Sequence, residues 1–132
     1  MAVLVDTSGV YAGISSRDPN HDQAVASWER LLGGPGPLIT HSLIEVESVA
    51  LIQARIGVEA VEAFRDHILP LLEVVEVSRD HRRQALAAMV ADRRRELSLV
   101  DRVSFALMRE LGLREAFAFD RHFAHAGFAL VD

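Results

Sequence analysis

The chain has 132 residues, a net charge of −5 and no cysteine, and half of its residues are hydrophobic. This composition is typical of a globular protein, and it excludes disulfide bonds and thiolate chemistry within the chain. The negative charge argues against a protein that coats nucleic acid through bulk attraction. We expect a single domain over residues 1–132, no signal peptide, no membrane-spanning segment and a cytoplasmic location.

Five short apolar runs predict the strands of a sheet. Each run is unbroken rather than alternating, as expected of strands that are covered on both faces. Asp6 directly follows the first run, and Asp120 directly follows the fourth. The predicted strands are Val3–Val5, Leu38–Thr40, Val74–Val77, Ala116–Phe119 and Phe128–Val131.

Helical patterns lie between these runs, and most begin at a capping residue. Asp18 precedes a proline, Ser42 and Ser78 are further capping candidates, and Ser98 with Asp101 resembles a capping box. Strands that alternate with helices predict a three-layer α/β/α sandwich with a mostly parallel central sheet. The predicted helices run from Asp18-Pro19 to Leu32, from Ser42 to Gly57, from Val58 to about Ile68, from Ser78 with Ala85, Leu86, Met89 and Val90 on one side, and from Ser98 to Gly112.

The two aspartates that follow strands are candidate site residues. In open parallel α/β sheets, sites form beyond the carboxyl ends of the strands. Asp6 and Asp120 therefore share one edge of the sheet if their strands are near neighbours. The alternative is that each caps the helix or turn that follows it, because aspartate is common there.

Glu47 is a third candidate, because the helical pattern predicts it on a buried stripe. Leu43, Val46, Ala50, Leu51 and Ala54 repeat at helical spacing, and Glu47 falls inside this series. A carboxylate among core residues is unfavourable unless it is paired or coordinates a metal. Glu45 projects from another side of the helix. The alternative is that Glu47 lies at the edge of the stripe or pairs with an arginine such as Arg55.

Asp101 is the fourth candidate, although a capping box already gives it a structural role. Four carboxylates from four segments would repel each other if they converged without a cation. Hard oxygen ligands select Mg²⁺ or Mn²⁺, which assist the hydrolysis of phosphodiester bonds. Three residues with hydroxyl groups are supporting candidates: Ser8, Thr7 and Ser104. Each could orient a carboxylate or a water, or could simply cap a helix or a turn.

The motifs together resemble the PIN-domain ribonucleases, and in particular the VapC-type toxins of toxin–antitoxin pairs. The resemblance covers nearly the whole chain and rests on the order and spacing of short segments. These segments are Val3-Leu4-Val5-Asp6-Thr7-Ser8, Ser42-Leu43-Ile44-Glu45-Val46-Glu47, Leu97-Ser98-Leu99-Val100-Asp101 and Ala118-Phe119-Asp120-Arg121-His122-Phe123.

The resemblance implies a parallel sheet, cleavage of RNA with Mg²⁺ or Mn²⁺, a homodimer and a protein antitoxin that blocks the site. It also implies that Asp6, Glu47, Asp101 and Asp120 are metal ligands and that Ser8 supports them. Shifting the alignment by two residues would match Glu45, rather than Glu47, to the position of the family's glutamate ligand. We choose Glu47 because it falls on the predicted helical stripe.

Two other functions remain open from the sequence. One is a non-catalytic α/β interaction module whose acidic cleft binds the arginines of a partner. The other is an aspartyl-phosphate phosphatase, although Ser8 stands where that chemistry usually has a second aspartate. We interpret His122 and His125 as an incidental pair, and the Arg93-Arg94-Arg95 run as a solvated helix face.

Overall fold

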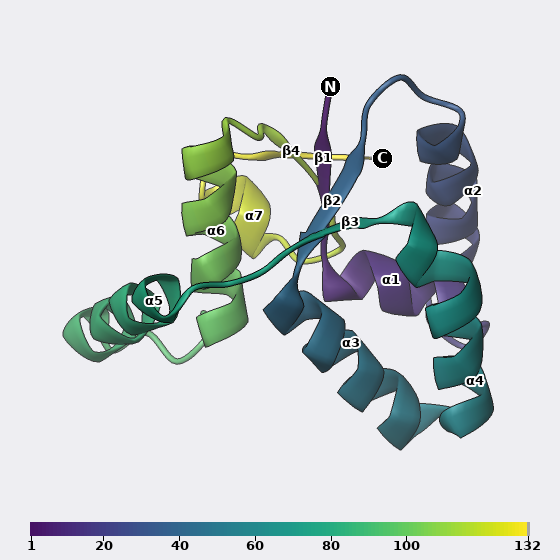
Figure 1. The fold of residues 1–132 in the computed structure, drawn as a ribbon, viewed down its shortest axis with the longest axis horizontal. Helices are drawn as coiled ribbons and strands as arrows, with labels where there is room; N and C mark the ends of the chain where they lie inside the picture. The colour runs from purple at the N-terminus through teal and green to yellow at the C-terminus, as the bar shows by residue number, and fades with distance from the viewer. Residues whose placement is uncertain (132) are drawn as a thin grey trace.

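A five-stranded parallel sheet forms the centre of the computed structural model, which describes residues 1–131 (Figure 1). Asp132, the last residue of the predicted domain, lies outside the described residues. Each predicted apolar run overlaps one strand, so these predictions are confirmed apart from shifts of one or two residues at the strand ends. The strands are β1 (Val3–Val5), β2 (Leu38–His41), β3 (Glu73–Val75), β4 (Glu115–Phe117) and β5 (Ala129–Leu130).

The strand order β3-β2-β1-β4-β5 places β1 in the middle of the sheet. β1 pairs in parallel with β2 on one side and with β4 on the other, with Val5 opposite Phe117. After β1 the chain adds β2 and β3 on one side and later adds β4 and β5 on the other. Such a reversal of direction opens a crevice at the carboxyl ends of the two strands that flank it, here β1 and β4.

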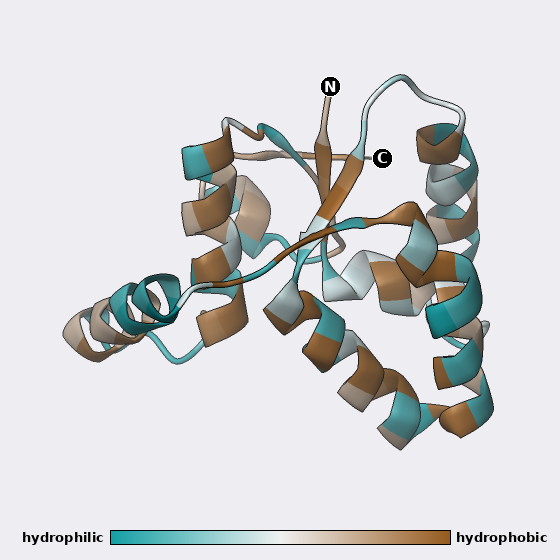
Figure 2. Cartoon of the chain, in the orientation of Figure 1, coloured by the Kyte–Doolittle hydropathy of each residue, from teal (hydrophilic) through white to brown (hydrophobic). Residues whose placement is uncertain are grey.

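Helices cover both faces of this sheet, which confirms the three-layer α/β/α architecture. Alternate residues of β1 point to opposite faces: Val3 and Val5 pack with Trp28 and Phe64, whereas Leu4 packs with Phe105. The strands β1 and β2 are largely hydrophobic, while the outer helices mix hydrophobic and hydrophilic residues (Figure 2). The helices are α1 (Thr7–Ile14), α2 (His21–Leu32), α3 (Ser42–Arg55), α4 (Val58–Ala63), α5 (Arg79–Asp92), α6 (Leu99–Leu111) and α7 (His122–His125), with a π turn at Phe64–Ile68 and a 3₁₀ turn at Leu69–Leu71.

Two predicted helix starts are wrong, one by two residues and one by a single residue. α2 begins at His21 rather than at Pro19, because the Asp18 side chain accepts a hydrogen bond from the backbone of Asn20 and closes a turn before the helix. At α3 the capping residue is His41, whose Nδ1 accepts from the Ile44 N–H, and Ser42 is the first helical residue. The Ser42 hydroxyl instead accepts a hydrogen bond from the Val77 N–H.

The apolar side predicted for α5 is mostly exposed. Ala85 is buried against α6, but Leu86 and Val90 are 51% and 57% exposed. Two short helices, α1 and α7, were not predicted. Within residues 1–131, every helix is too short or too polar to cross a membrane.

Candidate metal centre

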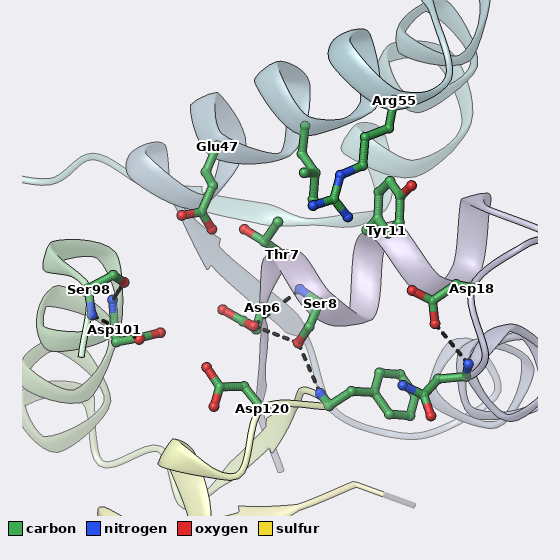
Figure 3. A pocket seen from close by; sticks show the side chains of 13 residues that line it. Asp6, Thr7, Ser8, Tyr11, Asp18, Glu47, Arg55, Ser98, Asp101 and Asp120 are labelled. Carbon is green, nitrogen blue, oxygen red and sulfur yellow. Dashed lines mark hydrogen bonds between the residues drawn. The ribbon is translucent and has the colours of Figure 1, made fainter. Parts of the chain in front are cut away.

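Four carboxylates converge on one cavity at the carboxyl ends of β1 and β4 (Figure 3). Asp6 follows β1 and Asp120 follows the β4 segment, while Glu47 reaches in from α3 and Asp101 from the first turn of α6. The cavity has a volume of about 420 Å³. All four acidic residues that the sequence singled out therefore line one cavity, although among the described residues only Asp101 and Asp120, with His122, have ligand atoms within 4.8 Å of one another.

Ser8 holds the Asp6 side chain in place. Asp6 caps α1 and is only 5% exposed, and its Oδ2 accepts hydrogen bonds from the Ser8 hydroxyl at 2.6 Å and the Ser8 N–H at 3.1 Å. The Ser8 hydroxyl oxygen in turn accepts from the Phe119 N–H at 2.9 Å. Ser8 thus connects the ends of β1 and β4. Thr7 also lines the cavity, with its hydroxyl 3.5 Å from that of Ser48.

The electrostatics of the cavity disfavour its own negative charge. Burial raises the pKa of Asp6 from 3.8 to about 6; the hydrogen bonds from Ser8 oppose this rise, and the charges of Asp101 and Glu47 add to it. Burial also raises the pKa of Asp101, with a further contribution from Asp120. Within residues 1–131, no arginine forms an ion pair with Asp6, Glu47 or Asp101. A bound cation would relieve this repulsion.

Asp101 takes part in both the helix start and the cavity. Its Oδ2 accepts from the Ser98 N–H at 3.2 Å, and the Ser98 hydroxyl accepts from the Asp101 N–H at 3.0 Å. The predicted capping box is therefore confirmed. Because the helix start fixes the side chain, Asp101 is held beside Asp120 without needing a ligand to order it.

His122 completes an acidic cluster that the sequence analysis missed. One ligand atom each from Asp101, Asp120 and His122 lie within 4.8 Å of one another. His122 Nδ1 is 2.9 Å from Asp120 Oδ1, yet it is poorly aligned for a hydrogen bond and is buried without a partner. A ring nitrogen that lies this close to two carboxylates without a hydrogen bond is a further candidate ligand for a divalent cation. The signal in the sequence was its position two residues after Asp120.

Glu47 lies at the cavity, but the stripe that predicted it is wrong. The buried residues of α3 are Ile44, Ser48 and Ile52, and Val46 is 66% exposed. Glu47 is adjacent to the true buried stripe, and its carboxylate points into the cavity in Figure 3. Glu45 lines a separate surface hollow on another side of α3.

Ser104 does not line the cavity. Its side chain is fully buried, and its hydroxyl lies 2.8 Å from His41 Nε2. The structure therefore gives Ser104 a place in the core, one helical turn beyond Asp101, rather than a supporting role beside the carboxylates.

This fold and this acidic site define a known class of nucleases. Residues 3–129 match the family model of the PIN domain. The chain belongs to the PIN-domain family, and it is therefore an enzyme that acts on phosphodiester bonds. The resemblance drawn from the short sequence motifs is confirmed.

The individual relatives extend this comparison. The 23S rRNA-specific endonuclease VapC20 of Mycobacterium tuberculosis is 34% identical over 130 residues, which cover 98% of this chain and 97% of VapC20. The crystal structure of VapC20, described as a sarcin-ricin loop cleaving toxin, gives a TM-score of 0.83 at 33% identity and covers 96% of both chains. FitAcB from Neisseria gonorrhoeae gives a TM-score of 0.70 at 15% identity, covering 100% of this chain and 97% of its own, which supports the fold alone.

Proposed function

We propose that this chain is a metal-dependent ribonuclease that hydrolyses RNA phosphodiester bonds, and that it is the toxin of a VapBC-type toxin–antitoxin pair. The convergence of four buried or half-buried carboxylates at the switch point of the sheet carries the proposal. Its similarity to VapC20 along nearly the whole of both chains supports the choice of RNA and of the toxin class.

The metal ligands in this proposal are Asp6, Glu47, Asp101 and Asp120, and the cation is Mg²⁺ or Mn²⁺. An all-carboxylate set favours hard cations of this kind. Such a cation would neutralise charge on the scissile phosphate and activate a water for attack. The nitrogen of His122 beside Asp120 favours Mn²⁺ over Mg²⁺ if it also binds the metal.

The chain's own residues prepare the site for this chemistry. Ser8 orients the Asp6 carboxylate, and the capping box orients that of Asp101. Arg55 lies at another part of the cavity, with its guanidinium 5.5 Å from the centre of the Tyr11 ring (Figure 3). We assign Arg55 to a phosphate of the bound RNA, because an arginine suits phosphate oxygens and no acid pairs with it among the described residues.

Two further parts of the proposal come from the family resemblance. They are a homodimer and a protein antitoxin that blocks the acidic cavity, whereas the single nuclease domain over residues 1–132 and the cytoplasmic location are proposed from length and composition. An antitoxin with an exposed arginine would complement the charge of this cavity.

Cleavage of RNA tests the proposed function directly. Total RNA and a 23S rRNA fragment containing the sarcin-ricin loop are incubated with Mg²⁺, Mn²⁺ or EDTA and the wild-type chain, Asp6→Asn, Glu47→Gln or Glu45→Gln. We expect cleavage by the wild type and Glu45→Gln only with metal, and a loss of at least about a hundredfold in the other two variants.

Two results would contradict the proposal. Cleavage that persists in EDTA would remove the metal from the reaction. A folded wild type that cuts neither RNA, but whose cavity binds arginine peptides, would favour a non-catalytic interaction module instead.

A further inference from the structure

A second hollow lies beside the metal centre, between α6 and α7, and the proposed nuclease function does not yet use it. Its volume is about 220 Å³. The rings of Phe105, His122 and His125 form much of its lining, and Leu97 and Ala126 add further apolar surface. We call this hollow the ring pocket. Its volume is below the ~300 Å³ of sites for drug-sized ligands, so it suits a single planar ring system.

The ring pocket and the metal centre share one side chain. His122 lines the pocket, and its Nδ1 lies 2.9 Å from Asp120 Oδ1 in the acidic cluster. Leu97 in the pocket likewise precedes Ser98, which lines the acidic cavity. A molecule in the ring pocket would therefore lie next to a phosphate held at the metal centre.

The lining of the ring pocket is basic rather than acidic, although one of its two arginines is paired with Glu96. Arg94 and Arg109 line it, and no aspartate or glutamate does so within residues 1–131. Both guanidiniums are held in place: Arg94 Nε bonds Glu96 at 2.8 Å, and Arg109 donates to the Ala126 carbonyl at 3.1 Å and lies 5.3 Å from the Phe128 ring. Each arginine keeps further N–H groups for an anion.

An RNA nucleotide matches this combination of rings and positive charge. Proteins that read single-stranded RNA stack unpaired bases on aromatic, histidine or arginine planes and bind the adjoining phosphates with arginine. Phe105 is only 6% exposed and packs edge-on against Phe123 at 5.0 Å, so it is a fixed inner wall, while the more exposed rings of His122 and His125, 6.4 Å apart, are the planes open to a base. The inner wall is therefore formed before a ligand arrives.

We propose that the ring pocket binds one unstacked nucleobase of the RNA beside the bond that is cut, and that Arg94 and Arg109 contact its flanking phosphates. This proposal rests on the proposed ribonuclease function, since it names a part of the same substrate. It makes the ring pocket a source of sequence preference next to the metal centre.

Nucleotide binding measured by NMR tests the proposal without any cleavage step. The wild-type chain in EDTA is titrated with the four nucleoside 5′-monophosphates and with ribose 5-phosphate, which has the same phosphate but no base. The ring protons of His122 and His125 report binding, and they are assigned with His122→Gln and His125→Gln. We expect at least one nucleotide to bind about tenfold more tightly than ribose 5-phosphate.

A matched pair of variants locates the binding. Ala126→Leu fills the ring pocket, whereas Ala124→Leu adds the same atoms at an exposed position nearby on α7. We expect the base-dependent gain in affinity to disappear in Ala126→Leu and to remain in Ala124→Leu. His125→Ala, which removes one ring from the pocket, replaces Ala126→Leu if that variant does not fold, and it should weaken nucleotide binding.

The outcomes separate this proposal from the nuclease function. Equal affinity for ribose 5-phosphate and all four nucleotides, or an undiminished gain in the pocket variants, would overturn the ring pocket as a base site even if the chain cuts RNA. Base-dependent binding by a chain that cuts no RNA would support the ring pocket as a base site and contradict only the nuclease proposal.

Discussion

Asp6 and His41 are buried ionisable residues at the ends of neighbouring strands, and they differ in how the chain satisfies them. Asp6 directly follows β1 and His41 ends β2, with exposures of 5% and 0%. His41 caps α3 through Nδ1, which accepts from the Ile44 N–H, and its Nε2 is 2.8 Å from the Ser104 hydroxyl. Both of its nitrogens therefore have partners within the chain.

The two residues respond to burial in opposite ways. Burial lowers the pKa of His41 to about 4, so the ring is neutral at pH 7 and needs no counter-charge. Burial raises the pKa of Asp6 to about 6, so the carboxylate is still mainly charged at pH 7 and faces the charges of Asp101 and Glu47. His41 stabilises the fold by itself, whereas Asp6 destabilises it until a cation binds.

Replacing each residue by asparagine should change stability in opposite directions. In EDTA at pH 7 we expect His41→Asn to lose about 2–3 kcal/mol, because Ser104 loses its partner and a cavity forms. Asp6→Asn should gain up to about 3 kcal/mol, because the rise of the Asp6 pKa from 3.8 to about 6 corresponds to a cost of this size at pH 7. Urea unfolding measures both. A loss of stability in Asp6→Asn would show that the acidic cavity is not under electrostatic strain.

The pH dependence of stability should separate the same two groups. Protonated Asp6 does not destabilise the fold, so the stability linked to its protonation is fully present below pH 3.8 and is lost as the pH rises through about 6. The raised pKa of Asp101 changes the free energy of unfolding in the same direction. The stability that neutral His41 contributes to the fold is present above pH 6.5 and is lost as the pH falls through about 4. Between pH 4.5 and 6.5 in EDTA, we expect stability to rise with pH in Asp6→Asn and to fall in His41→Asn. Parallel curves for the two variants would contradict this assignment.

Ser8→Ala should weaken metal binding without removing a ligand. The change deletes the 2.6 Å hydrogen bond to Asp6 and leaves the Phe119 N–H without its acceptor. We expect an affinity for Mn²⁺ that is about tenfold lower, measured by the shift in melting temperature during a metal titration. Ser16→Ala, at an exposed position beyond α1, is the control. Equal affinity in the two variants would mean that Ser8 does not position Asp6.

The smallest effect on metal binding should come from replacing Glu45, the residue that the sequence motif offers as an alternative to Glu47. Glu45→Gln should leave the Mn²⁺-induced rise in melting temperature unchanged, because Glu45 lines a different hollow. Glu47→Gln should reduce that rise. The reverse result would place Glu45 at the metal and require α3 to rotate.

The sequence could predict the parts of this molecule that depend on local patterns. Apolar runs identified the strands, and the Ser98–Asp101 spacing identified the start of α6. The acidic residues after β1 and β4 could be placed at one edge because parallel strands align their carboxyl ends. That inference needed only that the two strands be near neighbours, and they pair directly.

Features that depend on packing between distant segments could not be predicted. The periodicity of α3 predicted a buried stripe through Leu43, Ala50 and Leu51, but the way the helix packs in the fold buries Ile44, Ser48 and Ile52 instead. Leu86 and Val90 looked like core residues, but α5 packs against α6 at one side and leaves them exposed. His122 was interpreted as incidental, because nothing local shows that α6 brings Asp101 next to it.

The capping box of α6 also bears on how this chain can change in evolution. At its third helical position a helix start accepts glutamate or glutamine at least as well as aspartate. A glutamate at position 101 could therefore keep the hydrogen bond to the Ser98 N–H, but its extra methylene would displace the carboxylate from Asp120 and His122. The helix would tolerate this substitution and the acidic cluster would not. The requirement for aspartate at this position comes from the site, so relatives that keep the fold but carry glutamate here should have lost the metal chemistry.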